Sequence, residues 1–221
     1  MTTFAEQRDE ICRIGRSLFE RGYVHASAGN ISVRLPDARG FLITPTDACL
    51  GFLRPDQLAQ TDAAGAPIDG PRASKTLALH RSIYASDPAA QCVLHTHSTQ
   101  LVALSLEGVW RSDAILPPIT PYFVMKVGRV PLIAYHLPGD PAVAELVADE
   151  IAAAHARNAP IRAVMLARLG PTVWHDSPAA AMAALEELEE TARLWRMTDP
   201  KPAPLAEAQI EELRSAFGAQ W

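Results

Sequence analysis

Two histidines stand one residue apart at the end of an apolar run, in the segment VLHTHS at residues 93–98. In an extended chain, residues i and i+2 face the same side, so His95 and His97 can direct both imidazoles into one pocket. Catalytic zinc takes three protein ligands and leaves one position open, so two histidines need at least one further ligand. The pair indicates either half of a metal site or two packed, hydrogen-bonded histidines.

Three further segments have the residue types of an anion site. The segments at 27–30 (SAGN) and 44–46 (TPT) are small, polar and turn-rich. Their hydroxyls and backbone N–H groups could form an anion-binding concavity, or they could be ordinary tight turns. Ser74 is expected to be the N-cap of a helix over 75–84, and Lys75 adds a positive charge where helix N–H groups already favour anions. A small acid or a phosphate ester would suit such a pocket.

Hydrophobic periodicity predicts the elements that must position these residues. Helices are expected at 4–22, 75–84, 98–105, 141–156, 178–197 and 205–217. Strands are expected at 31–35, 41–44, 91–94, 130–135, 163–167 and 172–174, with two short ones at 55–58 and 67–68 around a turn. The chain is therefore predicted to be α/β, with the histidines at the end of a strand, the edge where ligands usually bind.

Some polar and thiol residues are expected to be structural. The acidic run at 186–190 is most simply a solvated helix face. His80 is expected to be packed on its helix and His155 to be solvated. The three cysteines are few, widely spaced and in apolar contexts, which favours buried free thiols over disulfides: Cys12, Cys49 and Cys92.

Length and charge narrow the class of protein. The 221 residues suffice for one domain, expected over 1–198, followed by a Pro-rich linker and a C-terminal helix over 199–221. A net charge of −5 argues against nucleic acid as a partner, because phosphate backbones are bound by clustered Lys and Arg. No run of about 18 apolar residues exists, and the N-terminal segment is too acidic for a signal peptide. We expect a cytoplasmic protein with no membrane partner.

Taken together, the motifs resemble the class II aldolase/adducin family. The resemblance covers about residues 5–198 and runs, in the family's order, through SAGNIS at 27–32, LITPT at 42–46, ASK at 73–75, LH at 79–80 and HTHS at 95–98. Within the family, four more segments resemble the branch that decarboxylates 3-oxo-tetronate 4-phosphates: 116–122, 126–131, 135–140 and 186–192.

The resemblance implies a three-layer α/β/α sandwich around a mostly antiparallel central sheet, assembled as a homotetramer with active sites between subunits. It also implies a divalent metal, commonly zinc, that polarises a substrate carbonyl and stabilises the enediolate formed when a C–C bond breaks. Matched residue by residue, the metal ligands are His95 and His97. The matched substrate-anion positions are Ser27, Gly29, Asn30, Thr46, Ser74 and Lys75.

Three positions depart from the family pattern. Thr76 stands where the family has a glutamate that acts as base or ligand, and a neutral hydroxyl cannot replace a carboxylate base. Leu169 stands at the third histidine, and leucine cannot ligate a metal. Asp47 replaces a glycine at the phosphate site and adds a negative charge there. Possible replacement ligands are His25, Asp47, His136 and His175.

Three hypotheses therefore remain open. The first is a carbon–carbon lyase, a decarboxylase or aldolase, acting on a small hydroxy or oxo acid, phosphorylated or not, through a metal at His95 and His97. The second is a catalytically degenerate member that binds a ligand or serves assembly. The third is metal-independent chemistry in the same pocket, with one of these histidines as base and Tyr122 or Tyr135 as acid. Thr76 and Asp47 stay among the candidate catalytic and substrate-binding residues.

Overall fold

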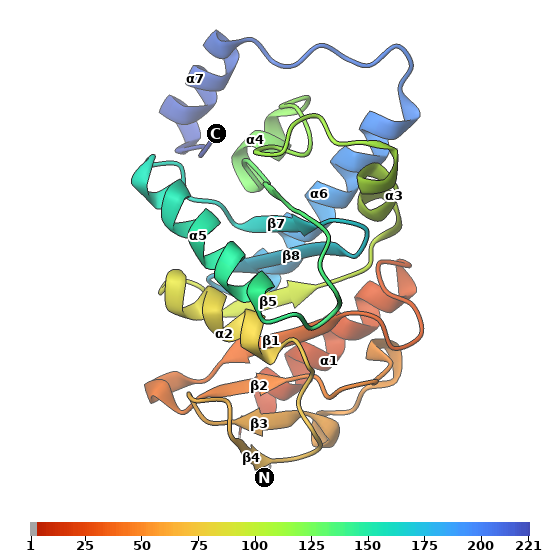
Figure 1. Cartoon of the computed structure of the whole chain (residues 1–221), viewed down its shortest axis with the longest axis vertical. Coiled ribbons are helices and arrows are strands. Elements are labelled where there is room, and N and C mark those ends of the chain that lie inside the picture. The colour runs from red at the N-terminus through yellow and green to blue at the C-terminus, as the bar shows by residue number, and fades with distance from the viewer. Residues whose placement is uncertain (1–3) are drawn as a thin grey trace.

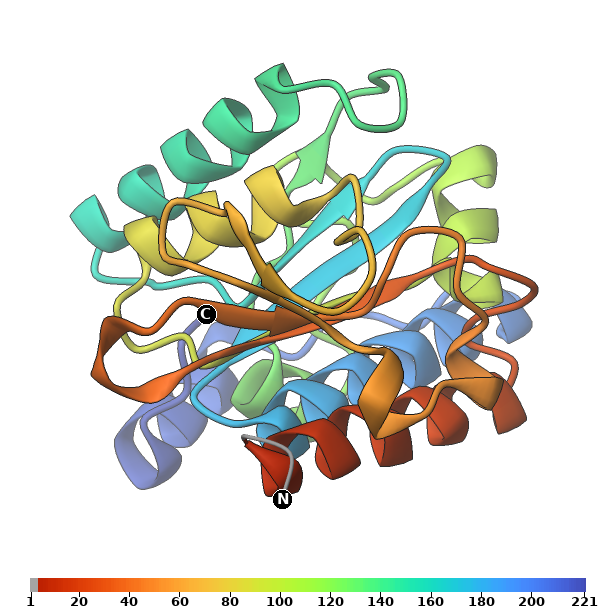
Figure 2. The same ribbon diagram turned by 90° about the horizontal axis from the view of Figure 1, so that it is seen from below.

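The computed structural model describes residues 4–221, which form one eight-stranded sheet with helices on both faces (Figures 1 and 2). The strands are β1 (Asn30–Arg34), β2 (Phe41–Ile43), β3 (Ala59–Thr61), β4 (Pro67–Asp69), β5 (Cys92–His95), β6 (Leu132–Ile133), β7 (Ala163–Leu166) and β8 (Gly170–His175). Their order across the sheet is β4-β3-β2-β1-β5-β8-β7-β6. Every pair is antiparallel except β6 with β7, which confirms the predicted mostly antiparallel sheet.

The helices form the two outer layers of the sandwich. They are α1 (Ala5–Glu20), α2 (Leu77–Ser86), α3 (Thr99–Glu107), α4 (Pro121–Lys126), α5 (Ala142–Ala156), α6 (Pro178–Met197) and α7 (Glu207–Phe217). Short 3-10 helices lie at Pro36–Ala38, Leu50–Phe52 and Pro55–Gln57. One hydrophobic cluster joins a sheet face to α1, α3, α4, α6 and α7, and a second joins the other face to α2 and α5. Figure 2 shows α1 and α6 beneath the sheet with α2 and α5 above it.

Strand β5 lies in the middle of the sheet and shows how both layers are filled. Cys92 and Leu94 belong to the cluster on the α1/α6 side, and Val93 belongs to the cluster on the α2/α5 side. This alternation follows the two-residue period of a strand, and because both faces are covered, the whole strand is buried. His95 has the parity of Val93, which places it on the α2/α5 side.

Two local expectations were wrong. Helix α2 begins at Leu77 with Thr76 at the N-cap, so Ser74 does not cap it; the Ser74 hydroxyl instead lies 2.9 Å from that of Thr76. The segment expected as a strand at 55–58 is a 3-10 helix, because the backbone turns at once and Gln57 N donates to Arg54 O over 2.9 Å. The strand that pairs across the predicted turn is β3.

The acidic run on α6 is only partly a solvated face. Glu189 is buried, with 5% exposure, and its carboxylate accepts hydrogen bonds from Gln100 N at 2.8 Å and Leu101 N at 3.1 Å. These amides belong to the first turn of α3, where backbone N–H groups have no helical partner. Burial raises the pKa of Glu189, and the two amide bonds oppose that rise. The prediction of a solvated face was wrong for Glu189 because the amides that it binds lie far away in the sequence.

The C-terminal segment packs onto the main body. Ile210 and Trp221 join the α1/α6-side cluster, and the Trp221 ring meets the Phe123 ring edge to face, with centroids 5.6 Å apart. The division of the chain at residue 198 stays a prediction. All three cysteines are free thiols, but only Cys92 is fully buried. Within residues 4–221, no helix has both the length and the apolar character needed to cross a membrane.

Candidate active site

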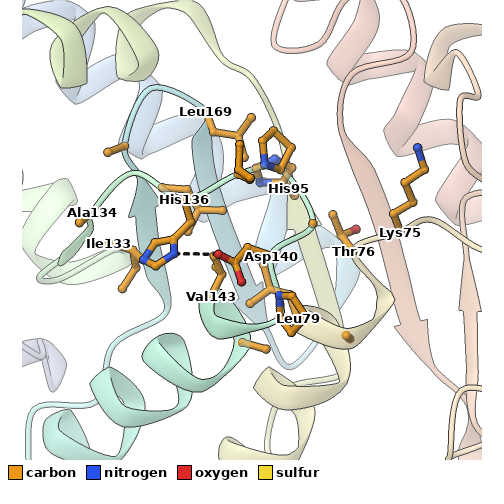
Figure 3. A pocket seen from close by; sticks show the side chains of 18 residues that line it. Lys75, Thr76, Leu79, His95, Ile133, Ala134, His136, Asp140, Val143 and Leu169 are labelled. Atoms are coloured by element: carbon orange, nitrogen blue, oxygen red, sulfur yellow. Dashed lines mark hydrogen bonds and ion pairs between the residues drawn. The ribbon is translucent and has the colours of Figure 1, made fainter.

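A cavity of about 80 Å³ opens at the end of β5 that carries His95 (Figure 3). It lies between the start of α2, the loop from β6 to α5 and the turn from β7 to β8. Most of its wall is apolar, including Leu79, Ile133, Val143 and Leu166. The polar exceptions are few: Lys75, Thr76, His95, His136 and Asp140. A mostly apolar cavity with a few converging polar groups is typical of a small-molecule site.

His95 is held in one orientation by β8. The antiparallel pairing of β5 with β8 sets His95 opposite Thr172. Its Nδ1 lies 3.0 Å from the Pro171 carbonyl oxygen, which can only accept, so Nδ1 carries the proton and donates. Nε2 is therefore left with a free lone pair. Burial, more than the neighbouring His97, lowers the pKa of His95 to about 3, so the imidazole is neutral at pH 7.

His97 lies beside His95 but is less enclosed. The two ring centroids are 5.2 Å apart, and the His25 ring centroid lies 6.3 Å from that of His97. Burial and the proximity of His25 lower the pKa of His97. The sequence expectation that His95 and His97 lie together is therefore met, with His25 close to them.

The donor set does not fit a three-ligand catalytic metal site. Among residues 4–221, no group of three or more His, Cys, Asp or Glu side chains is placed to hold a metal ion. His95 and His97 supply two imidazole nitrogens, whereas catalytic zinc normally has three protein ligands. The residues of this chain offer the metal two of the three ligands it needs.

Two residues that depart from the family pattern at metal-site positions, Thr76 and Leu169, both face this cavity. Thr76 and Leu169 line its wall together with His95, and Figure 3 shows Leu169 next to the His95 ring. The turn that carries Leu169 is pressed against the histidine segment, because a Cβ on Gly170 would lie 2.0 Å from the Thr96 carbonyl oxygen. The position matched to the third histidine thus lies at the histidine pair, and a leucine occupies it.

The suggested replacement ligands do not complete the site. His175 lies at the other end of β8, where it pairs in register with Cys92. His136 lines the cavity, but its Nδ1 is engaged by Asp140 at 3.1 Å. Asp47 is exposed on the 44–47 loop. Within the described chain, none of these residues joins His95 and His97 in a group of three.

The segments predicted to bind an anion lie at the same end of the sheet. Ser74 N donates to Thr44 O at 3.2 Å and Thr46 N donates to Arg72 O at 3.0 Å, which joins the 44–47 and 72–75 loops. Gly29, at φ 83°, passes so close to His95 that a Cβ would lie 2.9 Å from its carbonyl oxygen, so only glycine fits. The exposed side chains of these three segments are Ser27, Asp47, Arg72 and Lys75.

Asn30 is the anion-site residue closest to the histidines in register. It pairs with His95 across β1 and β5 and is 6% exposed. Its Oδ1 is buried and has no hydrogen-bond partner. Since an unpaired buried amide oxygen is costly, this atom points to a ligand or an ordered water as its partner.

The two tyrosines predicted as acids lie apart from the cavity wall. Tyr122, on α4, is 62% exposed and Tyr135, beyond β6, is 60% exposed. Neither side chain lines the cavity of its own chain, although Ala134 and His136 on either side of Tyr135 do. Their catalytic roles stay predictions.

His80 is a packed helix histidine, as expected. It is fully buried, and its Nδ1 lies 2.7 Å from the Ser32 hydroxyl, which also lies 2.8 Å from the Tyr84 hydroxyl. Burial, with a contribution from His95, lowers the pKa of His80 to about 3. His155 is exposed on α5, also as expected.

Sequence reasoning missed the pairing of His136 with Asp140 in the cavity wall. His136 was considered only as a replacement metal ligand. The available signal was the carboxylate placed just before an Ala-rich helix, a position that typically accepts from helix N–H groups. Asp140 does accept from Ala142 N at 3.0 Å, which fixes the carboxylate in place.

Comparison with known proteins agrees with this fold. The family model for the class II aldolase and adducin N-terminal domain matches residues 9–196, so the chain belongs to that family. A 3-oxo-tetronate 4-phosphate decarboxylase from Cupriavidus necator is 54% identical over 226 aligned residues, covering 100% of both chains. A protein of the same name from Escherichia coli is 42% identical, covering 94% of this chain and 95% of its own.

A solved structure supports the same assignment. The crystal structure of YgbL from Escherichia coli, described as an aldolase, epimerase or decarboxylase, matches with a TM-score of 0.86 and 40% identity. The match covers 95% of this chain and 98% of YgbL. The sandwich fold expected from the sequence is thus confirmed.

Proposed function

We propose that this protein is a carbon–carbon lyase that decarboxylates 3-oxo-tetronate 4-phosphate. The observation that carries the proposal is the 54% identity to a protein of that name across the full length of both chains. The cavity at His95 and the joined polar loops beside it support a site for this activity at that end of the sheet. A phosphorylated sugar acid also matches the small acid or phosphate ester that the polar segments predict.

The chemistry asks two things of the site. The substrate carries a carboxylate and a phosphate, so it needs donors for anions, which the backbone N–H groups and side chains of the 27–30, 44–47 and 72–75 segments can supply. When carbon dioxide leaves, the electron pair of the broken C–C bond passes into the adjacent 3-oxo carbonyl. The second requirement is therefore a group that meets the charge developing on that oxygen.

Different residues of the site are assigned to anion binding and to the charge that develops on the 3-oxo oxygen. The neutral His95, with a free Nε2, lines the cavity, and Asn30, with its unpaired amide oxygen, pairs with it in register; both are assigned to the substrate's reacting end. Lys75 lines the cavity and, with Ser74 and Thr46 of the joined loops, is assigned to the anion, whose binding the charge of Asp47 opposes. A divalent metal, zinc, at His95 and His97 stays a prediction of the family resemblance.

A rate measurement tests the proposed function. The purified chain is mixed with 3-oxo-tetronate 4-phosphate and carbon dioxide release is followed, with a buffer blank because 3-oxo acids decarboxylate unaided. We expect a saturable rate above the blank, and a loss of most of it in His95→Ala. A rate equal to the blank over the full substrate range would overturn the proposal.

A second candidate function is ligand binding without turnover. Thr76 and Leu169 favour it, because they replace chemically active residues of the family pattern at the cavity wall. A ligand selective for the folded state raises its stability. An upward shift in melting temperature with the substrate or a non-reactive analogue, and no carbon dioxide, would support this second candidate.

We also propose that the chain works as a homotetramer in the cytoplasm. The family resemblance supports the assembly, and several large apolar side chains are exposed and available for contact: Phe52, Tyr122, Tyr135, Leu137 and Met197. Light scattering on a sizing column tests the proposal. A mass of one chain, about 24 kDa, at micromolar concentration would contradict it.

A further inference from the structure

A histidine–aspartate pair forms part of the cavity wall opposite the start of α2. His136 Nδ1 lies 3.1 Å from Asp140 Oδ2, and Figure 3 shows the two side chains directed toward each other. The side chains are 27% and 34% exposed, so the pair is sheltered yet open to a ligand. Both residues line the same cavity as His95, from a different loop of the chain.

The aspartate fixes how the imidazole can act. Asp140 Oδ1 accepts from Ala142 N at 3.0 Å, and this bond, followed by the contact with His136, lowers the pKa of Asp140. An ionised carboxylate can only accept, so Nδ1 of His136 must donate to it. The remaining nitrogen, Nε2, is then the one that can carry or release a proton. The same division of roles orients the imidazole in catalytic histidine–carboxylate pairs.

The cavity offers few other groups for that task. Thr76 cannot exchange a proton at neutral pH. Nδ1 of His95 donates to the Pro171 carbonyl, which ties that proton to β8 and away from the cavity. Of the cavity-lining residues in the described chain, only Lys75, His136 and Asp140 remain as titratable groups besides His95. Lys75 is exposed at the rim, which leaves the imidazole of His136 as the sheltered proton-carrying group of the cavity wall.

We propose that His136, oriented by Asp140, is the proton donor of the decarboxylation, an inference that rests on the proposed function. The bond between the carboxyl carbon and its neighbour breaks, and its electron pair forms a carbon–carbon double bond as carbon dioxide leaves. The 3-oxo oxygen takes the proton from His136 Nε2, which gives a neutral enediol and a neutral imidazole. The enediol then gains a proton on carbon and returns its hydroxyl proton, so the net reaction consumes one solvent proton and yields dihydroxyacetone phosphate.

The chain contains a matched control for this pair. His175 Nδ1 lies 2.7 Å from Asp176 Oδ1, so the chain holds a second histidine beside an aspartate, here a sequence neighbour whose backbone N–H also donates to Nδ1. This pair lies at the opposite end of β8 and does not line the cavity. Substitutions at His175 therefore remove an equivalent imidazole without touching the proposed site.

The experiment measures carbon dioxide release by His136→Ala and His175→Ala in the full chain, each with and without added imidazole. We expect kcat to fall about 100-fold or more in His136→Ala, since general acid catalysis contributes about 10²–10⁴-fold, and to recover partly with imidazole. His175→Ala is expected to keep the wild-type kcat. His136→Gln serves as a second variant that fills the same volume and is expected to lose kcat equally.

Asp140→Asn tests the positioning role. Asparagine keeps an acceptor for Ala142 N, so the start of α5 is preserved, but it no longer holds the Nδ1 proton of His136 as a carboxylate does. We expect kcat to fall about tenfold with KM unchanged, and Asp140→Glu to recover part of it.

The outcomes separate this inference from the proposed function. A wild-type rate equal to the blank overturns both. Wild-type turnover with full kcat in His136→Gln overturns the inference alone. A folded His136→Ala whose lost kcat is not raised by imidazole also overturns it, because that loss would be structural.

Discussion

The two ends of the paired strands β5 and β8 carry similar residues and differ in what surrounds them. At one end, His95 lies opposite Thr172, and the cavity with the His136–Asp140 pair opens beside them. At the other end, Cys92 lies opposite His175, which contacts its own neighbour Asp176. Asp176 N also donates to His175 Nδ1 at 2.9 Å, so both contacts of this ring nitrogen are made with the next residue in the chain.

The difference shows that residue type alone does not define a site. At the cavity end, β8 orients His95, and Asp140, whose carboxylate is fixed by the start of α5, holds His136 from four residues along the same loop. These contacts leave Nε2 of each ring free at a shared cavity. At the other end, the contact is between sequence neighbours, and neither residue lines that cavity.

The largest effect on stability is expected from adding a side chain at Gly170, at the end of the turn between β7 and β8 beside the cavity. Gly170→Ala would place a Cβ 2.0 Å from the Thr96 carbonyl oxygen at a φ of 142°, so backbone must move. We expect the free energy of unfolding to fall by at least about 3 kcal/mol in urea titrations. Gly139→Ala, where φ is 86° but no atom lies within 4 Å, is the control and should cost about 1 kcal/mol. Equal losses would show that the contact with Thr96 is unimportant.

A smaller but specific effect is expected from supplying a third imidazole. Leu169→His adds a ligand next to His95 and His97, and we expect zinc affinity to rise about 100-fold, or about 2.7 kcal/mol. Competition with a chromogenic chelator measures the change. Leu137→His places an imidazole elsewhere on the cavity wall and should leave zinc affinity at the wild-type value. No gain in Leu169→His would mean that residue 169 does not face the histidine pair.

The buried histidines predict a pH dependence of stability. Folded His80 and His95 have a pKa of about 3 against an ordinary 6.5, so between these values the unfolded chain binds protons that the folded chain does not. Stability therefore falls as pH is lowered below 6.5, by up to roughly 1.4 kcal/mol per pH unit for each histidine. His80→Gln removes one of these protons. Between pH 6.5 and 5, its free energy of unfolding should therefore fall by about 2 kcal/mol less than that of the wild type.

Comparing the pH dependence of stability in wild type and His80→Gln separates the contribution of His80 from that of the carboxylates. Unfolding free energies of wild type and His80→Gln, measured at several pH values, share every other titrating group. Parallel curves would mean that His80 gains no proton on unfolding in this range.

The smallest effect is expected from relieving a strained residue in the turn after β7. Arg168 has φ 64°, a left-handed conformation that asparagine adopts more readily than arginine. Its backbone N–H donates to Ser105 Oγ at 3.0 Å, which the substitution keeps. Arg168→Asn should raise the free energy of unfolding by about 0.5–1 kcal/mol. Arg157→Asn, at φ −89°, should give no such gain in the same thermal or urea measurement.

The fold was predicted best where the signal is local. The hairpin of β1 and β2 and the whole of α6 match their predicted ranges closely, because alternation and helical periodicity are written in neighbouring residues. The order of strands across the sheet was not predicted from the residues. Pairs such as β1 with β5 and β5 with β8 join segments distant in sequence, and pattern alone does not choose among them.

The candidate site, like the fold, was predicted from the sequence only in part. The histidine pair and the polar segments around Gly29, Asn30 and Ser74 were found from residue type and resemblance, and the structure brings them to one end of the sheet. The contacts of His136 and Glu189 were missed. The His136 contact joins residues four apart within one irregular loop, and Glu189 meets amides of α3, 89 positions away in the chain. Such contacts follow from packing, which periodicity does not report.

The most direct test of the account is the formation of dihydroxyacetone phosphate from 3-oxo-tetronate 4-phosphate by the purified wild-type chain. A coupled assay that reduces this product with NADH reads the rate continuously and ignores unrelated carbon dioxide. The account predicts a saturable rate well above the unaided one, lowered in His136→Gln and unchanged in His175→Gln. A wild-type rate that equals the unaided rate at every substrate concentration would contradict it.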